Sequence, residues 1–115
     1  MENYQTLDLA FHALADPTRR AVVSRLTRGP APVKVLAAPF DMGLPSFLKH
    51  LRVLERDGLI RSEKIGRVRT CHVNTETLGA AESWLAEQRR LWQASADRLA
   101  DYVETNMSES PDDAG

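Results

Sequence analysis

The chain has 115 residues, of which 43% are hydrophobic and 27% charged. This composition is typical of a single soluble globular domain and excludes a disordered or fibrous chain. No apolar run approaches the roughly 18–20 residues needed to cross a bilayer, and the N-terminus lacks the pattern of a signal peptide. The only cysteine, Cys71, cannot form an intramolecular disulfide, and the sequence predicts a cytoplasmic protein that does not contact membranes.

The formal net charge of −1 conceals an uneven distribution. Residues 16–73 hold 12 Lys/Arg and 5 Asp/Glu, whereas the rest of the chain holds 3 Lys/Arg and 11 Asp/Glu. The field of a surface charge decays within a Debye length of roughly 8–10 Å, so the local surplus decides what a surface attracts. The central block therefore indicates a nucleic-acid-binding surface that the near-neutral total hides.

Two helices are predicted at the N-terminus. Residues 7–15 place Leu7, Phe11 and Leu14 on one apolar helical face. In the segment that follows, Asp16 is a good N-cap and Pro17 suits the first helical position. The core stripe expected of this second helix consists of Val22, Val23 and Leu26.

A helix-turn-helix is predicted next. Residues 33–38 form one or two helical turns between prolines, and a longer helix begins near Leu44 and ends before Gly58. The apolar residues of the longer helix have the spacing of a buried face: they are Leu44, Phe47, Leu48, Leu51 and Leu54. The residues that fall elsewhere on the helical wheel are Pro45, Ser46, Lys49, Arg52 and Arg56, with His50 near the boundary.

Beyond this helix the pattern changes to that of a β-hairpin. The runs "LIRSEKI" and "VRTCHV" flank Gly66 and Arg67, and a glycine in the first position of a two-residue loop is typical of a type II′ turn. This turn would place Lys64 opposite Arg69. Since facing cations destabilise an isolated hairpin, the pair indicates that the hairpin meets an external anion.

A long helix is predicted from about Thr75 to roughly Glu104. Every seventh residue is large and apolar, in the order Leu78, Leu85, Trp92 and Leu99. So small a domain cannot bury the whole apolar face of so long a helix, and part of it is predicted to pack on a second copy. Residues 107–115 are expected to form a flexible acidic tail, which leaves residues 1–106 as the DNA-binding and dimerisation domain.

The predicted fold is mainly α with a small β-hairpin, in the order α-α-α-α-β-β-α, which is a winged helix-turn-helix. In such proteins the second helix of the motif enters the major groove and the hairpin lies on the neighbouring backbone or minor groove. The predicted DNA-binding residues are Pro45, Ser46, Lys49, His50 and Arg52 on the helix and Lys64, Arg67 and Arg69 on the wing. The helix residues read bases or position the protein, and the wing cations neutralise phosphates.

The strings "ALADPTRRAVVSRL" and "LPSFLKHLRVLERDGLIRSEKIGRVRTCHV" resemble the ArsR-type (arsenic-resistance repressor) regulators of bacteria over residues 7–103. The resemblance implies a repressor that binds an imperfect palindrome at its own promoter as a homodimer. It also implies operator-reading positions at Ser46, Lys49 and His50, and pairing through the first and last helices. The corresponding interface residues are Leu7, Phe11, Leu78, Leu85, Trp92 and Leu99.

The sequence departs from the common family pattern in two ways. Leu48 stands where a polar residue is frequent, and it is either a core residue or a contact to a thymine methyl. The segment before the recognition helix has no cysteine and the last helix has no histidine, whereas a transition-metal site needs three or four converging ligands. We therefore expect no metal and no cofactor. The resemblance is to the branch of sporulation-delay regulators, with a non-metal signal such as a small-molecule inducer.

Several side chains have structural interpretations beside functional ones. Cys71 lies near cationic residues that favour a thiolate, but it has no resolving partner and its position opposite Ser62 points inward, so a core role is favoured. Arg19 and Arg20 are expected to form structural ion pairs near Asp16. The lone histidines, His12 and His72, are expected to be packing or surface residues.

Three alternative functions remain to be weighed. One is a metal- or thiol-responsive repressor. Another is an enzyme, since Ser46 and His50 have the helical spacing of a nucleophile and a base; nothing nearby orients the histidine, and we expect no catalysis. The third is a winged helix that binds only proteins, which would have no need of Lys64, Arg67 and Arg69 on the wing beside Lys49 and Arg52 on the helix.

Overall fold

A computed structural model describes residues 2–108 of the chain, with side chains from 5 to 107. The chain forms two units that divide after Glu82. None of the helices in the described range is long and apolar enough to cross a membrane.

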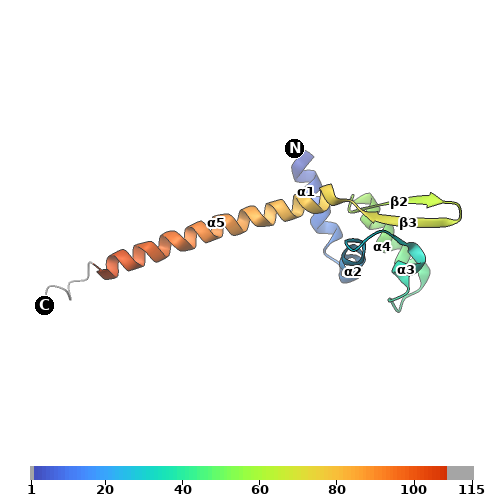
Figure 1. Cartoon of the computed structure of the whole chain (residues 1–115), viewed down its shortest axis with the longest axis horizontal. Helices are drawn as coiled ribbons and strands as arrows, with labels where there is room; N and C mark the ends of the chain where they lie inside the picture. The colour runs from blue at the N-terminus through green and yellow to red at the C-terminus, as the bar shows by residue number, and fades with distance from the viewer. Residues whose placement is uncertain (1, 109–115) are drawn as a thin grey trace. The chain divides into compact units, whose positions relative to one another are not determined.

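The first unit confirms the predicted winged helix-turn-helix. Its helices are α1 (Glu2–Ala13), α2 (Pro17–Leu26), α3 (Val33–Ala37), α4 (Leu44–Arg56) and the start of α5 (Thr75–Ser108), and its strands are β1 (Ala31–Pro32), β2 (Ile60–Ile65) and β3 (Val68–Val73) (Figure 1). Helices α3 and α4 form the predicted helix-turn-helix, and β2 and β3 form the wing.

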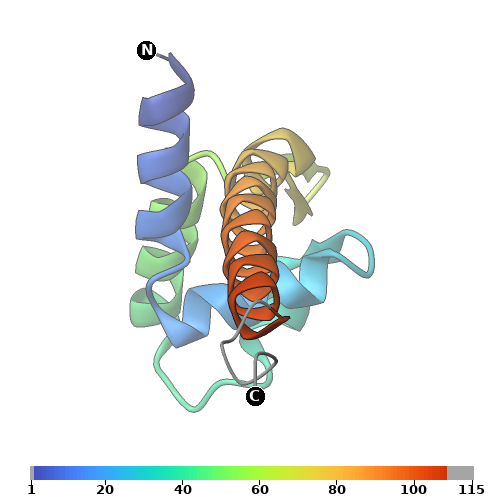
Figure 2. The same cartoon turned by 90° about the vertical axis from the view of Figure 1, so that its left-hand side faces the viewer.

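Local chemistry explains where α2 begins. Asp16 has an extended backbone, and its carboxylate accepts a hydrogen bond of 3.0 Å from the backbone N–H of Arg19, as an N-cap does. Pro17 occupies the first turn, where its missing N–H leaves no bond unmade. Figure 2 shows that α1 passes into α2 through a short turn, so that the two helices run in different directions.

The sheet contains a strand that the sequence did not predict. Its order is β1-β3-β2, with Ala31 opposite Cys71 and Pro32 opposite Thr70. This strand has two residues, too few to produce an alternating pattern, and one of them is a proline, which is tolerated only at a sheet edge. The wing is therefore anchored to the segment before α3 as well as to α4.

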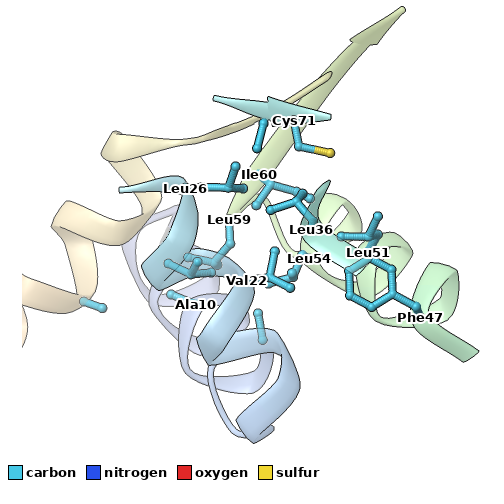
Figure 3. Packing of buried hydrophobic residues seen from close by; sticks show 14 residues of the cluster. Ala10, Val22, Leu26, Leu36, Phe47, Leu51, Leu54, Leu59, Ile60 and Cys71 are labelled. Atoms are coloured by element: carbon cyan, nitrogen blue, oxygen red, sulfur yellow. The ribbon is translucent and has the colours of Figure 1, made fainter. Parts of the chain in front are cut away.

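The core of the first unit joins α1, α2, α3, α4 and the sheet. Figure 3 shows Phe47, Leu51 and Leu54 of α4 in one cluster with Val22 and Leu36. The predicted core residues of α2 are all buried: Val22, Val23 and Leu26.

One expectation about an apolar face was wrong. The side chain of Leu44 is 55% exposed because it lies at the first residue of α4 rather than over the core. Helix α1 buries Ala10 and Ala13 completely, whereas Phe11 is 36% exposed. Leu48, for which two roles were open, is partly buried and packs against the core.

The second unit consists, within the described range, of residues 83–108 of α5. Three members of the predicted seven-residue repeat are exposed here: Leu85, Trp92 and Leu99. A groove of about 570 Å³ runs along Trp92, Ala96, Leu99 and Val103. The helix extends past Glu104 to Ser108, so it includes the start of the predicted acidic tail, whose residues 109–115 lie outside the described residues.

Candidate nucleic-acid interface

One face of α4 combines exposure with free polar groups. Phe47, Leu51 and Leu54 hold the helix against the core, and the opposite side chains point away from it. The exposed residues of α4 include Pro45, Ser46, Lys49, Arg52 and Arg56. Among the described residues, Ser46, Lys49 and Arg52 have no hydrogen-bond or ion-pair partner. The amphipathic pattern in the sequence predicted this face correctly.

The N-terminal end of α4 is electrostatically open. Gly43 occupies the N-cap position and supplies no side-chain cap, and the first turn contains no acidic residue. The first N–H groups of a helix carry a partial positive charge that favours anions such as phosphate. The first turn of α4, which a recognition helix presents to DNA, thus carries no carboxylate of its own.

His50 is placed differently from the other predicted DNA-binding residues of α4. It is half-buried, its Nδ1 lies 3.6 Å from Oδ2 of Asp16, and Nη1 of Arg19 is 3.5 Å from the same nitrogen. The histidine therefore faces the start of α2. This contact links the N-cap of α2 to the recognition helix.

The wing has the predicted register. Lys64 is opposite Arg69 and Ser62 is opposite Cys71. Gly66 has a φ of +64°, and no residue other than glycine has a positive φ in the described chain, so the two-residue turn is of type II′. Lys64 and Arg67 are exposed and have no partner among the described residues.

Arg69, in contrast, has partners within the chain. Its Nε donates to Oγ of Ser62 at 3.0 Å, and its Nη2 lies 3.3 Å from Oε1 of Glu55. Ser62 also donates to the same carboxylate oxygen. The expectation that the facing cations Lys64 and Arg69 need an external anion is therefore revised, because Glu55 of α4 already neutralises Arg69. This three-residue network ties the wing to the recognition helix.

Arg19 and Arg20 are structural, but the expected ion pairs with Asp16 were wrong, because both guanidinium groups donate to backbone carbonyls instead. The Nε of Arg19 donates to the carbonyl of Ala13 at 2.8 Å, and Nη1 of Arg20 donates to the carbonyl of Leu14 at 2.9 Å. A helix leaves its last carbonyls without partners, and these two arginines satisfy carbonyls at and just beyond the end of α1. They hold α1 and α2 together.

Sequence reasoning missed a buried carboxylate at the end of α4. Asp57 is 2% exposed. Its Oδ2 lies 2.5 Å from Nδ1 of His12, and its Oδ1 accepts a 3.1 Å hydrogen bond from Nε of Arg56. His12 and Asp57 are 45 residues apart in the chain, and the sequence around Asp57 indicated only a turn. No local signal could have found this pair.

Cys71 and His72 illustrate the two faces of β3. Cys71 is 1% exposed, and burial, with a smaller contribution from Glu55, raises the pKa of its thiol. A raised pKa disfavours the reactive thiolate, which agrees with the predicted core role. His72 lies on the other face, where its Nε2 is 3.1 Å from Oε1 of Glu63.

The described residues contain no group of three or more His, Cys, Asp or Glu that could hold a metal ion. The predicted interface residues come from α4 and the wing, which the contacts between Glu55, Ser62 and Arg69 hold together. The surface therefore offers cations with free guanidinium or ammonium groups on a recognition helix and on an adjoining hairpin. Such a surface can neutralise phosphates and donate hydrogen bonds to base edges.

Comparison with known proteins agrees with this geometry. A family model described as a helix-turn-helix domain matches residues 14–63. The HTH-type transcriptional regulator Rv2034 of Mycobacterium tuberculosis is 34% identical over 105 residues, which cover 91% of this chain and 95% of that relative. The transcriptional repressor SdpR of Bacillus subtilis is 29% identical over 75 residues, covering 65% of this chain and 83% of the relative.

A solved structure extends the similarity to the fold. The crystal structure of the ArsR family transcriptional regulator RHA00566 is 60% identical and superposes with a TM-score of 0.70. The match covers 76% of this chain and 91% of that one. The relatives are transcriptional regulators, not enzymes. The chain therefore belongs to the ArsR family of transcriptional regulators and carries a winged helix-turn-helix DNA-binding domain.

Proposed function

We propose that this regulator is an autoregulating repressor, which binds a near-palindromic operator as a homodimer and is released by a non-metal signal. The observation that carries the proposal is the set of polar and cationic side chains without partners on two connected elements. They are Ser46, Lys49 and Arg52 on α4 and Lys64 and Arg67 on the wing. DNA supplies phosphates and base edges that these side chains can contact.

The side chains divide into readers and anchors. Helix α4 enters the major groove, where Ser46 and Lys49 contact base edges and Arg52 contacts guanine or phosphate. Lys64 and Arg67 contact the flanking backbone and carry no sequence information. His50 and Arg69 hold α4 and the wing in position, because each already contacts a carboxylate of its own chain.

The homodimer is supported by the apolar surface of α5. Leu85, Trp92 and Leu99 recur at the seven-residue spacing that packs one helix on another, and their exposed fractions are 53%, 73% and 64%. Exposed apolar surface of this extent is typical of an interaction site. Of the other interface residues that the resemblance implies, Phe11 is exposed, whereas Leu7 and Leu78 pack on the core of their own chain.

Repression rather than activation is supported by the similarity to SdpR, which is a transcriptional repressor. A signal other than a metal ion is supported by the absence of a candidate ligand cluster in the described part of the chain. Burial of Cys71 argues against a thiol signal, because oxidants reach an exposed thiolate far more readily.

Selection of binding sites from a pool of random-sequence duplexes tests this function. We expect an enriched near-palindrome whose half-sites are one or two helical turns apart, because a two-fold dimer presents two copies of α4. The double variant Lys49→Ala/Arg52→Ala is expected to enrich nothing while keeping the far-UV circular dichroism of the parent. Failure of the parent protein to enrich any sequence would contradict the proposal.

A further inference from the structure

Leu44 is an apolar side chain in an unexpected place. The spacing of residues in α4 assigned it to the core, but its side chain is 55% exposed, whereas Phe47, Leu51 and Leu54 on the same helix are buried. Burying a leucine side chain stabilises a protein relative to leaving it exposed. The folded monomer leaves most of that contribution unused at the first residue of its recognition helix.

The side chains that follow Leu44 along its face of α4 change from apolar to charged. Residues four apart on a helix are neighbours on one face, and this row contains Leu44, Leu48 and Arg52. Leu48 packs against the core, and Arg52 is exposed without a partner among the described residues. Leu44 is therefore the apolar member of the row that offers free surface, at the helix end where helix-turn-helix proteins contact base edges.

Only one base presents an apolar group in the major groove. Thymine carries a C5-methyl there, whereas the other edges present hydrogen-bond donors and acceptors. Leucine cannot make a hydrogen bond with its side chain, so a polar base edge would gain nothing from contact with it. We propose that Leu44 contacts the methyl group of one thymine in each half-site and thereby selects an A·T pair there.

This inference rests on the proposed function, since it needs a duplex in which α4 occupies the major groove. It adds a residue that reads sequence and assigns the base that it reads. The sequence left open a thymine contact by Leu48. The proposal assigns that contact to Leu44, the exposed residue one helical turn earlier.

The test uses the duplex selected from the random pool, in which each thymine is replaced in turn by deoxyuridine. This base lacks the methyl group but keeps the hydrogen-bonding edge of thymine. For the parent protein we expect one symmetry-related pair of positions to be methyl-sensitive. Removing a buried methyl group costs about 0.8 kcal/mol, so the dissociation constant should rise roughly fourfold for each half-site.

The variants Leu44→Ala and Leu44→Gln should lose the methyl sensitivity at those positions while still binding the duplex. Both replace an exposed side chain with a good helix former, so both are expected to fold, and circular dichroism checks this. Val35→Ala, which removes an exposed aliphatic side chain from α3, is the matched control and should keep the sensitivity.

Two results would overturn the inference alone: no thymine of the selected duplex is methyl-sensitive, or the sensitivity is the same in Leu44→Ala and the parent. In both cases the proposed function would stand, because a sequence would still have been selected. If no duplex is selected, the proposed function and the inference fall together.

Discussion

Nδ1 of His12 lies 2.5 Å from Oδ2 of Asp57, and this contact joins α1 to the residue that follows the recognition helix. The Asp57 side chain is fully buried, whereas that of His12 is 55% exposed. Arg56 supplies a second partner from the side facing solvent. The orientation of the C-terminal end of α4 thus depends on a residue from the first helix of the chain.

His12→Ala should lower the free energy of unfolding by about 1–3 kcal/mol, because it leaves the buried carboxylate of Asp57 short of a hydrogen-bond partner. Urea denaturation at pH 6 measures the change. His72→Ala is the matched control, since its partner Glu63 is 59% exposed and such surface pairs contribute only about 0–1 kcal/mol. Equal effects of the two substitutions would show that the Asp57 contact is not stabilising.

The N-cap of α2 should make stability depend on pH. The backbone N–H of Arg19 is the largest cause that lowers the pKa of Asp16 from its ordinary value of 3.8, and nearby His50 lowers it further. A carboxyl group with a lowered pKa in the folded state stabilises that state above its unfolded pKa, and this contribution is lost as the pH falls through the folded value.

Asp16→Ala is therefore expected to lower the free energy of unfolding by about 0.5–2 kcal/mol at pH 7. The difference in unfolding free energy between the variant and the parent should shrink as the pH falls below the ordinary pKa of an aspartate. Thermal unfolding at several pH values measures both proteins. Asp16→Asn, which keeps a capping oxygen but cannot ionise, separates capping from charge. A penalty for Asp16→Ala that grows in acid would contradict the assignment.

Arg67 and Arg69 lie on the same wing but should affect DNA binding differently. Arg67 has no partner in the described structure, so Arg67→Ala should weaken all duplexes similarly and reduce the slope of log K against log salt by about one. Arg69→Ala should also loosen the wing, because it removes contacts to Ser62 and Glu55. An unchanged slope for Arg67→Ala would remove this residue from the phosphate contacts.

The apolar seam of α5 predicts the oligomeric state. Trp92→Glu should yield monomers in analytical ultracentrifugation, because it introduces a charge into the groove lined by Ala96 and Leu99. Ser83→Glu adds the same charge on the opposite side of the helix and should leave the dimer intact. Dimers that survive Trp92→Glu would mean that this seam is not the interface.

Metal ions should have little effect on operator binding. We expect zinc, nickel, cadmium or arsenite to change the operator affinity by no more than about threefold, since a bound metal needs several converging ligands. Titration of each ion into the protein–DNA complex, followed by fluorescence anisotropy, measures the change. Large release of DNA by any of them would revive the metal-responsive alternative.

Features that depend on neighbouring residues could be predicted from the sequence. The loop of Gly66 and Arg67 set the hairpin register, and Asp16 with Pro17 marked the start of α2. The spacing of Phe47, Leu51 and Leu54 identified the buried face of the recognition helix, and with it the exposed cations on the opposite face.

Features that depend on contacts between distant segments could not be predicted. The His12–Asp57 pair joins residues 45 positions apart, and Arg69 finds Glu55 on another element. The apolar spacing also predicted wrongly that Leu44 is buried. Spacing assigns a residue to one face of a helix, but it does not show whether the core extends as far as the end of that helix.

Recognition of a DNA sequence by this surface can be measured directly. Fluorescence anisotropy should compare the DNA upstream of the protein's own gene with a shuffled duplex at two salt concentrations. We expect a preference of about 10³ or more for the upstream DNA, with affinity that falls steeply as salt rises. Equal and weak binding to both duplexes would contradict autoregulation through this site and would favour a general nucleic-acid-binding or partner-binding surface.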